Sequence, residues 1–208
     1  MGRFLICYIT DRRGVEPEPL ERRIESAIDA GMDWIQIREK DLPTRALLRL
    51  AATGVEQARE TKILVNDRLD VALAAGAHGI HLGGSSIPAA EACPRVPQGF
   101  RVGVSCHSLE EAIRAEFAGA SYVLFGPVFE TPSKLPYGPP LGLDKLREAT
   151  ARVKIPVLAI GGITLDRVRA CWAAGAAGIA AIRLFQECAS LDARVRELRA
   201  MVLPERKP

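Results

Sequence analysis

Three polar side chains at alternate positions, Gln36, Arg38 and Lys40, form the first group in the sequence that could bind a ligand. Alternate residues of an extended segment point to the same side, so all three can face one space. Two cations there suit a phosphate or pyrophosphate, which arginine can bind through paired hydrogen bonds. The competing interpretation is surface charge paired with Glu39 and Asp41. We favour anion binding, because the group directly follows an apolar run that predicts a buried strand.

Two further segments could hold phosphate groups. Lys134 lies in a loop after another predicted strand and adds a third cation. Gly161 and Gly162 precede a helix expected to begin near Leu165, so their backbone N–H groups could bind phosphate at a helix N-terminus. The glycines could equally serve only a tight turn between a strand and a helix.

Asp67 and His107 are the candidates for metal binding and proton transfer. Asp67 could ligate Mg²⁺, which takes one or two carboxylates together with phosphate oxygens and water. It could equally cap a helix beginning near Arg68. His107 follows a predicted strand, where an imidazole can act as acid or base near neutral pH; a structural role is the alternative. His78 and His81 are expected to be structural.

These groups are expected to be positioned by eight strands that alternate with helices. Short runs rich in Ile, Val, Leu and Ala predict the strands, and several are apolar throughout, as parallel strands buried on both faces are. The strands are expected at Leu5–Thr10, Trp34–Arg38, Ile63–Asn66, Gly79–Leu82, Val102–Ser105, Tyr122–Gly126, Val157–Ile160 and Gly178–Ile182. Helices are expected at Arg45–Arg59, Leu109–Phe117, Leu143–Arg152 and Leu165–Ala173.

A short phrase of small residues recurs four times where a helix should end and a strand begin. Its glycines, Gly31, Gly76, Gly119 and Gly175, suit a helix C-terminus, where the chain commonly takes a positive φ. Alternating strands and helices with short connections predict a parallel sheet, and eight units favour closure. We therefore expect an α/β protein with one TIM (β/α)₈ barrel domain over residues 1–208; an open doubly wound sheet is the alternative.

Composition narrows the range of partners. The 208 residues are 48% hydrophobic, and 28 basic against 25 acidic residues give a net charge of +3 without a polybasic segment. We expect small phosphorylated substrates as partners, and no nucleic acid or membrane. Five cysteines without a CxxC pair fit reduced thiols, and the apolar stretch near the start is too short for a signal sequence. A cytoplasmic protein is expected, and a homo-oligomer is left open.

The chain resembles the thiamin-phosphate synthase and thiazole tautomerase (TenI) family. Six segments carry this resemblance in order: Gln-Ile-Arg-Glu-Lys-Asp at 36–41, Val-Asn-Asp-Arg-Leu-Asp-Val-Ala-Leu at 65–73, Gly-Ile-His-Leu-Gly at 79–83, Gly-Val-Ser-Cys-His-Ser at 103–108, Phe-Gly-Pro-Val-Phe-Glu-Thr at 125–131 and Ala-Ile-Gly-Gly-Ile-Thr at 159–164. The match extends from about Tyr8 to Ile182. It implies a barrel and a role in thiamin biosynthesis.

The synthase of this family joins hydroxymethylpyrimidine diphosphate to a thiazole phosphate carboxylate, and releases pyrophosphate and CO₂ through a pyrimidine cation. On this resemblance, the pyrophosphate-binding positions are Arg38, Lys40, Asn66 and Lys134, and Asp67 matches a Mg²⁺ ligand. Cations and metal there would stabilise the charge growing on the leaving group.

The remaining matched positions concern the two organic substrates. Ser105 and Thr131 match substrate-contacting positions, and Gly161 and Gly162 match the site of the thiazole phosphate. Our catalytic candidates are His107, Ser105 and Lys134. The substrate-binding candidates are Gln36, Arg38, Lys40, Asn66, Thr131, Gly161, Gly162 and Arg183.

Two positions depart from the synthase pattern. Ser86 stands where the family usually has an aspartate that is a second Mg²⁺ ligand, and Arg183 replaces a small serine that helps to hold phosphate. The arginine could bind phosphate itself or fill the pocket. The missing carboxylate favours the tautomerase, in which His107 would move the proton, or a non-catalytic barrel that binds a thiamin precursor. The cations keep the synthase as the leading hypothesis.

Overall fold

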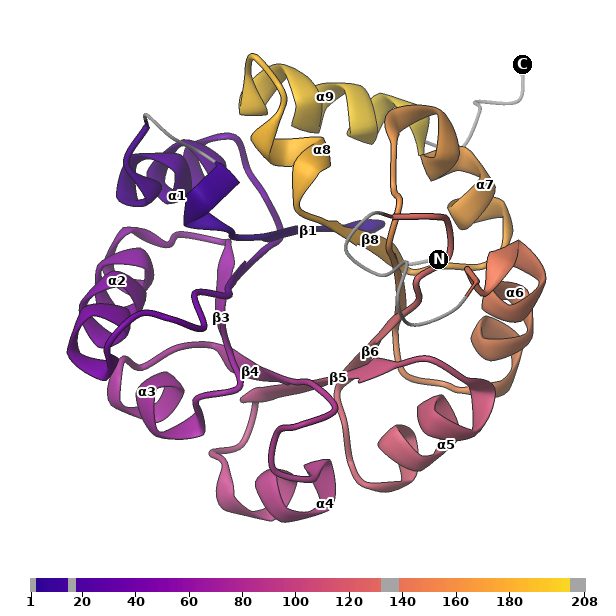
Figure 1. Ribbon diagram of the computed structural model, residues 1–208, viewed down its shortest axis with the longest axis horizontal. Helices are drawn as coiled ribbons and strands as arrows, with labels where there is room; N and C mark the ends of the chain where they lie inside the picture. Colours follow the sequence, from indigo (N-terminus) through magenta and orange to yellow (C-terminus); the bar gives the residue numbers. More distant parts are fainter. Residues whose placement is uncertain (1–2, 15–17, 132–138, 203–208) are drawn as a thin grey trace.

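The computed structural model describes residues 3–14, 18–131 and 139–202. Eight parallel strands close into a barrel in chain order, as the ring in Figure 1 shows. The strands are β1 (Leu5–Ile9), β2 (Trp34–Ile37), β3 (Lys62–Asn66), β4 (Gly79–Leu82), β5 (Arg101–Cys106), β6 (Tyr122–Phe125), β7 (Val157–Ile160) and β8 (Gly178–Ala181). The expected TIM barrel is confirmed. The open sheet is wrong, because β1 also pairs with β8, with Tyr8 opposite Ala181.

Helices surround the ring and follow the strands in order (Figure 1). The α-helices are α1 (Leu20–Asp29), α2 (Thr44–Gln57), α3 (Leu69–Ala74), α4 (Ala89–Ala92), α5 (Leu109–Phe117), α6 (Gly142–Arg152), α7 (Val168–Ala173), α8 (Arg183–Gln186) and α9 (Leu191–Met201). Short 3₁₀ turns are η1 (Arg12–Gly14), η2 (Cys93–Arg95) and η4 (Leu165–Arg167). The helix expected at Leu165–Ala173 is therefore a 3₁₀ turn followed by α7.

The four glycines at the helix ends behave as the repeated phrase predicts. Gly31, Gly76, Gly119 and Gly175 have φ values of 74°, 63°, 88° and 88°. Glycine adopts this left-handed conformation easily. At each of the four positions it lets the chain leave a helix and enter the next strand within a few residues.

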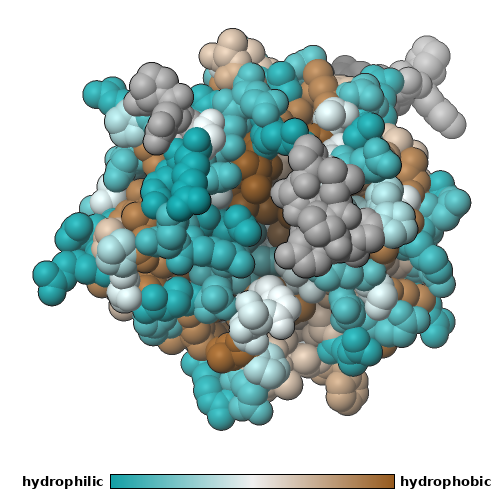
Figure 2. Space-filling model, viewed as in Figure 1, coloured by the Kyte–Doolittle hydropathy of each residue, from teal (hydrophilic) through white to brown (hydrophobic). Residues whose placement is uncertain are grey.

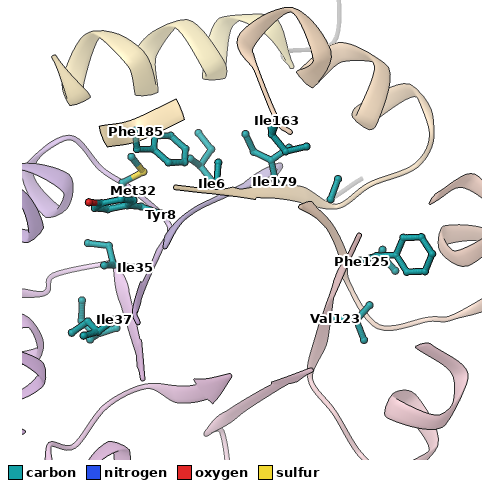
Figure 3. Packing of buried hydrophobic residues seen from close by; sticks show 14 of the residues in the cluster. Ile6, Tyr8, Met32, Ile35, Ile37, Val123, Phe125, Ile163, Ile179 and Phe185 are labelled. Carbon is teal, nitrogen blue, oxygen red and sulfur yellow. The ribbon is translucent and has the colours of Figure 1, made fainter. Parts of the chain in front are cut away.

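The strands present one face to the helices and the other to the barrel axis. Ile6, Tyr8, Ile35 and Ile37 are buried on the outer side, between the ring and the helices (Figure 3). A separate buried cluster fills the inside: Cys7, Ile9, Trp34, Leu64, Tyr122, Leu124, Leu158 and Ala180. Because side chains alternate along a strand, residues two positions further along from this inner set also face the axis. The barrel therefore carries its predicted polar groups on top of an apolar plug.

Among residues 3–14, 18–131 and 139–202, no helix is long and apolar enough to cross a membrane.

Candidate active site at the barrel mouth

The barrel opens into a hollow at the centre of the face seen in Figure 2. Hydrophilic residues gather on the side of this hollow that lies over β1 to β3, and apolar residues lie deeper in it (compare Figures 1 and 2). This arrangement suits a ligand with a charged end and a flat, less polar part.

Arg38 and Lys40 are not neutralised by the acidic residues beside them. Glu39 is only 5% exposed, and its carboxylate accepts hydrogen bonds from the Thr10 hydroxyl at 2.6 Å and from the Arg12 backbone and guanidinium at 3.2 Å. The surface-charge interpretation required Glu39 to pair with its neighbours, and alternation along the chain instead turns it to the opposite side.

The second acidic neighbour, Asp41, is also engaged elsewhere. Its Oδ2 accepts from Arg12 Nη2 at 2.6 Å and from Arg13 Nη2 at 2.7 Å, and its Oδ1 accepts from Arg12 Nη1. The hydrogen bonds from Arg12 hold the pKa of the Asp41 carboxyl well below its usual value. No ion pair to Arg38 or Lys40 occurs among the residues that the structure describes. Their charges therefore remain available at the mouth.

Gln36 and Asn66 lie side by side on neighbouring strands. Gln36 is 1% exposed, and its Nε2 donates to Asn66 Oδ1 at 3.0 Å. The Gln36 Oε1 atom is buried and has no hydrogen-bond partner within the described ranges. Buried polar atoms are normally paired, so an N–H donor of a ligand would satisfy this oxygen.

Ser105 is half-buried on β5 and faces the axis, where its Oγ lies 2.9 Å from His81 Nε2. His81 is buried, and its Nδ1 lies 3.2 Å from the Tyr122 hydroxyl. The expectation that His81 is structural did not include this contact with a candidate catalytic residue. His78 fits its structural assignment, because its Nδ1 accepts the Ile63 backbone N–H at 3.1 Å.

His107 lies at the rim and is exposed. Its Nδ1 bonds the carbonyl oxygen of Gly126, so Nδ1 must carry the proton, and its backbone N–H donates to Glu111 at 2.6 Å. These bonds fix the orientation of the imidazole and leave Nε2 without a hydrogen-bond partner among the described residues. A catalytic role for His107 stays a prediction.

Asp67 is the described carboxylate best placed to hold a metal. It directly follows β3, is exposed, and has a φ of 66°, the one positive value among the described non-glycine residues. Strained backbone of this kind is common at functional sites. Its carboxylate makes no hydrogen bond or ion pair with a described residue, and α3 is capped at Arg68 without a side-chain bond. The capping alternative is therefore not what the structure shows.

Ser86 does not supply the missing ligand. Its Oγ accepts the Gly83 backbone N–H at 2.8 Å within the loop after β4. No group of three or more His, Cys, Asp or Glu side chains that could hold a metal occurs among the described residues. The donors fit a Mg²⁺ ion that takes one ligand from Asp67 and the rest from a bound diphosphate and water. They do not fit an ion held by protein groups alone.

Gly161 and Gly162 have φ values of 92° and 63°, and the segment after β6 lies directly against them. A Cβ at Gly161 would be 2.5 Å from Pro127 Cβ, and one at Gly162 would be 2.8 Å from Phe129 Cβ and still closer to a backbone oxygen. Both the positive φ values and this close packing require glycine, as the tight-turn interpretation expects. Phosphate binding at these residues stays a prediction.

The three remaining candidates are Arg183, Thr131 and Lys134. Arg183 is exposed at the first position of α8, so it does not fill the interior of the barrel. Thr131 is half-buried in the connection that follows β6. Lys134 lies outside the described residues.

Two residues important to the site were not found from the sequence. Thr10 and Arg12, which follow β1, bind Glu39 across the β1–β2 boundary, and Thr10 Oγ1 also accepts the Arg38 backbone N–H at 2.9 Å. The available signal was strand alternation, which separates Glu39 from Arg38. The partners of Glu39 could be identified only from the tertiary structure.

The family model described as thiamine monophosphate synthase matches residues 6–185. A thiamine-phosphate synthase from Methanocella arvoryzae is 44% identical, over 95% of this chain and 94% of the relative. One from Moorella thermoacetica is 40% identical, over 95% of both chains. A solved structure of thiamine phosphate pyrophosphorylase from Pyrococcus furiosus has a TM-score of 0.86 and 37% identity, over 96% of this chain and 95% of that one.

Proposed function

Because the chain belongs to the thiamine monophosphate synthase family, we propose that the mouth of its barrel is the active site of a thiamine-phosphate synthase. The enzyme is a transferase of thiamin biosynthesis that joins hydroxymethylpyrimidine diphosphate to a thiazole phosphate and releases pyrophosphate. The residue roles below are our proposal.

The observation that carries this assignment is the pairing of the acidic residues near Arg38. Glu39 is hydrogen-bonded to Thr10 and Arg12, and Asp41 is paired with Arg12 and Arg13. The positive charges of Arg38 and Lys40 are therefore available to a ligand. A diphosphate is the part of the substrate that needs two cations. A tautomerase binds only the thiazole phosphate, so it would need no anion site at Arg38 and Lys40 in addition to the one for that phosphate.

In the reaction, the bond between the pyrimidine methylene carbon and the diphosphate oxygen breaks, and its electron pair leaves with the pyrophosphate. Arg38 and Lys40 stabilise the charge that grows on the leaving group. Gln36 Oε1 accepts a hydrogen bond from the pyrimidine substrate, which orients the ring. The thiazole nitrogen then attacks the methylene carbon of the resulting cation. We place the thiazole phosphate near Gly161, Gly162 and Arg183.

Mg²⁺ would be held by Asp67 together with diphosphate oxygens and water. When bound, it neutralises charge on the diphosphate and so makes the leaving group better. We expect the protein to bind Mg²⁺ weakly, because Ser86 offers no second carboxylate.

The test is pyrophosphate release by the purified protein from the two substrates, measured with Mg²⁺ and with EDTA. We expect release with Mg²⁺ and little with EDTA. A folded protein that releases no pyrophosphate would refute the synthase assignment. If it instead isomerised the thiazole phosphate carboxylate in EDTA, and lost this activity in His107→Ala, the tautomerase would be the correct function.

A further inference from the structure

A chain of hydrogen-bonded polar side chains runs along the centre of the barrel, from the buried interior up to Ser105 at the mouth. It comprises Tyr122, His81 and Ser105, which lie on β6, β4 and β5. His81 Nδ1 is 3.2 Å from the Tyr122 hydroxyl, and His81 Nε2 is 2.9 Å from Ser105 Oγ. His81 thus connects the apolar plug to a side chain at the mouth.

Gly103 allows this chain to form. It lies on β5 directly opposite Tyr122 in the register, two residues before Ser105. A Cβ at Gly103 would overlap the Tyr122 ring and hydroxyl. The tyrosine therefore crosses the space where a side chain of residue 103 would be, with its ring centroid 4.7 Å from that of Trp34. The absence of a side chain at this one position lets the phenol reach the imidazole.

The burial of Tyr122 decides which way the hydrogen bonds run. Tyr122 is 1% exposed, and His81 Nδ1 is the one partner of its hydroxyl among the described residues. Buried hydroxyl groups normally donate to an acceptor, and His81 Nδ1 is the acceptor within reach of this one. The Tyr122 O–H must therefore donate to Nδ1, which cannot then carry a proton itself. The neutral imidazole has its proton on Nε2, and this N–H donates to Ser105 Oγ.

The same reasoning fixes the Ser105 hydroxyl. Its oxygen accepts from His81, so its own proton is left to point elsewhere, and the half-buried side chain faces the mouth. We propose that His81, held by Tyr122, is a positioning residue that makes Ser105 a hydrogen-bond donor to an acceptor atom of the substrate, either a phosphate oxygen or a ring nitrogen. This inference rests on the proposed function for the identity of the substrate, but its proton arrangement does not.

The environment of His81 keeps the ring neutral. Burial, with a smaller contribution from the nearby positive charge of Arg38, lowers the pKa of His81 to about 3. A protonated ring would donate from both nitrogens and would compete with the Tyr122 proton.

The first test is ¹⁵N NMR of the imidazole rings, with His78→Asn and His107→Asn used to assign the signals. We expect His81 as the neutral tautomer with the proton on Nε2. A proton on Nδ1 would overturn the inference. This measurement needs no activity, so it stays decisive if the protein releases no pyrophosphate and the proposed function fails.

The second test asks whether Tyr122 acts through Ser105. Tyr122→Phe and Ser105→Ala are each expected to lower kcat/KM by about tenfold, the effect of one hydrogen bond. Both variants should alter the same kinetic parameter, either kcat or the KM of one substrate. If they alter a KM, the substrate concerned is the one that accepts the hydrogen bond from Ser105. In the Ser105→Ala background, Tyr122→Phe should have no further effect.

Tyr8→Phe is the matched control, because Tyr8 is equally buried but its ring packs against Phe185 outside the barrel. It should leave kcat/KM unchanged. If Tyr122→Phe and Ser105→Ala have independent, multiplicative effects while the wild type is active, then Tyr122 acts by another route and the inference is wrong.

Discussion

Replacing Gly162 by alanine should destabilise the barrel by more than its backbone conformation alone explains. At a φ of 63°, a side chain costs about 1–2 kcal/mol. The new Cβ would also lie 2.8 Å from Phe129 Cβ, and such overpacking costs a further ~1–3 kcal/mol. We expect a total loss of about 2–5 kcal/mol in the free energy of unfolding.

Gly31→Ala separates the two contributions. Gly31 has a φ of 74°, but a Cβ there would meet no atom within 4 Å. It should therefore cost only the conformational ~1–2 kcal/mol. Urea unfolding of both variants gives the difference, and Tm should fall by about 2–4 °C for each kcal/mol in a chain of this size. Equal losses would show that the segment after β6 is not held against Gly162, and would refute the packing argument.

Two further predictions concern stability against pH and metal dependence. Because the folded-state pKa of His81 is about 3 and the unfolded value about 6.5, its neutral form stabilises the fold above pH 6.5, and this stability is lost as the pH falls from 6.5 towards 3. Relative to His81→Gln, the free energy of unfolding of the wild type should thus fall by about 1.4 kcal/mol for each pH unit in this window. Chemical denaturation at several pH values measures it. If the two proteins show the same dependence of unfolding free energy on pH, His81 is not buried as described. Ser86→Asp adds a second carboxylate, which can still accept the Gly83 N–H. It should lower the Mg²⁺ concentration needed for half-maximal pyrophosphate release, and Ser85→Asp serves as the control. Equal Mg²⁺ requirements for Ser86→Asp and the wild type would place the metal elsewhere.

The barrel was predictable because its signals are local and repeated. Each strand is a short apolar run, and four of the connections end in a glycine such as Gly31 or Gly175, whose positive φ the structure confirms. Every strand end was predicted to within one residue. The helix expected at Leu165–Ala173 is less regular than its pattern indicated, since it begins with the 3₁₀ turn η4 before α7.

The site was predictable only in outline. Alternation placed Gln36, Arg38 and Lys40 together, but the sequence could not show that Glu39 binds Thr10, a residue 29 positions away. Such partners depend on the order of strands in the closed barrel. The role of His81 was missed for the same reason, since a buried histidine gives no local sign of what its two nitrogens contact.

The most direct test of the account is calorimetric titration of inorganic pyrophosphate, in the presence of Mg²⁺, into three proteins. The wild type should bind, and Arg38→Gln should bind about tenfold or more weakly, because it loses a charge-assisted contact. Arg13→Gln removes an equally cationic side chain of the rim, but one that is paired with Asp41, and it should bind like the wild type. Equal affinities for the wild type and Arg38→Gln would contradict the claim that the free cations of the mouth hold the diphosphate.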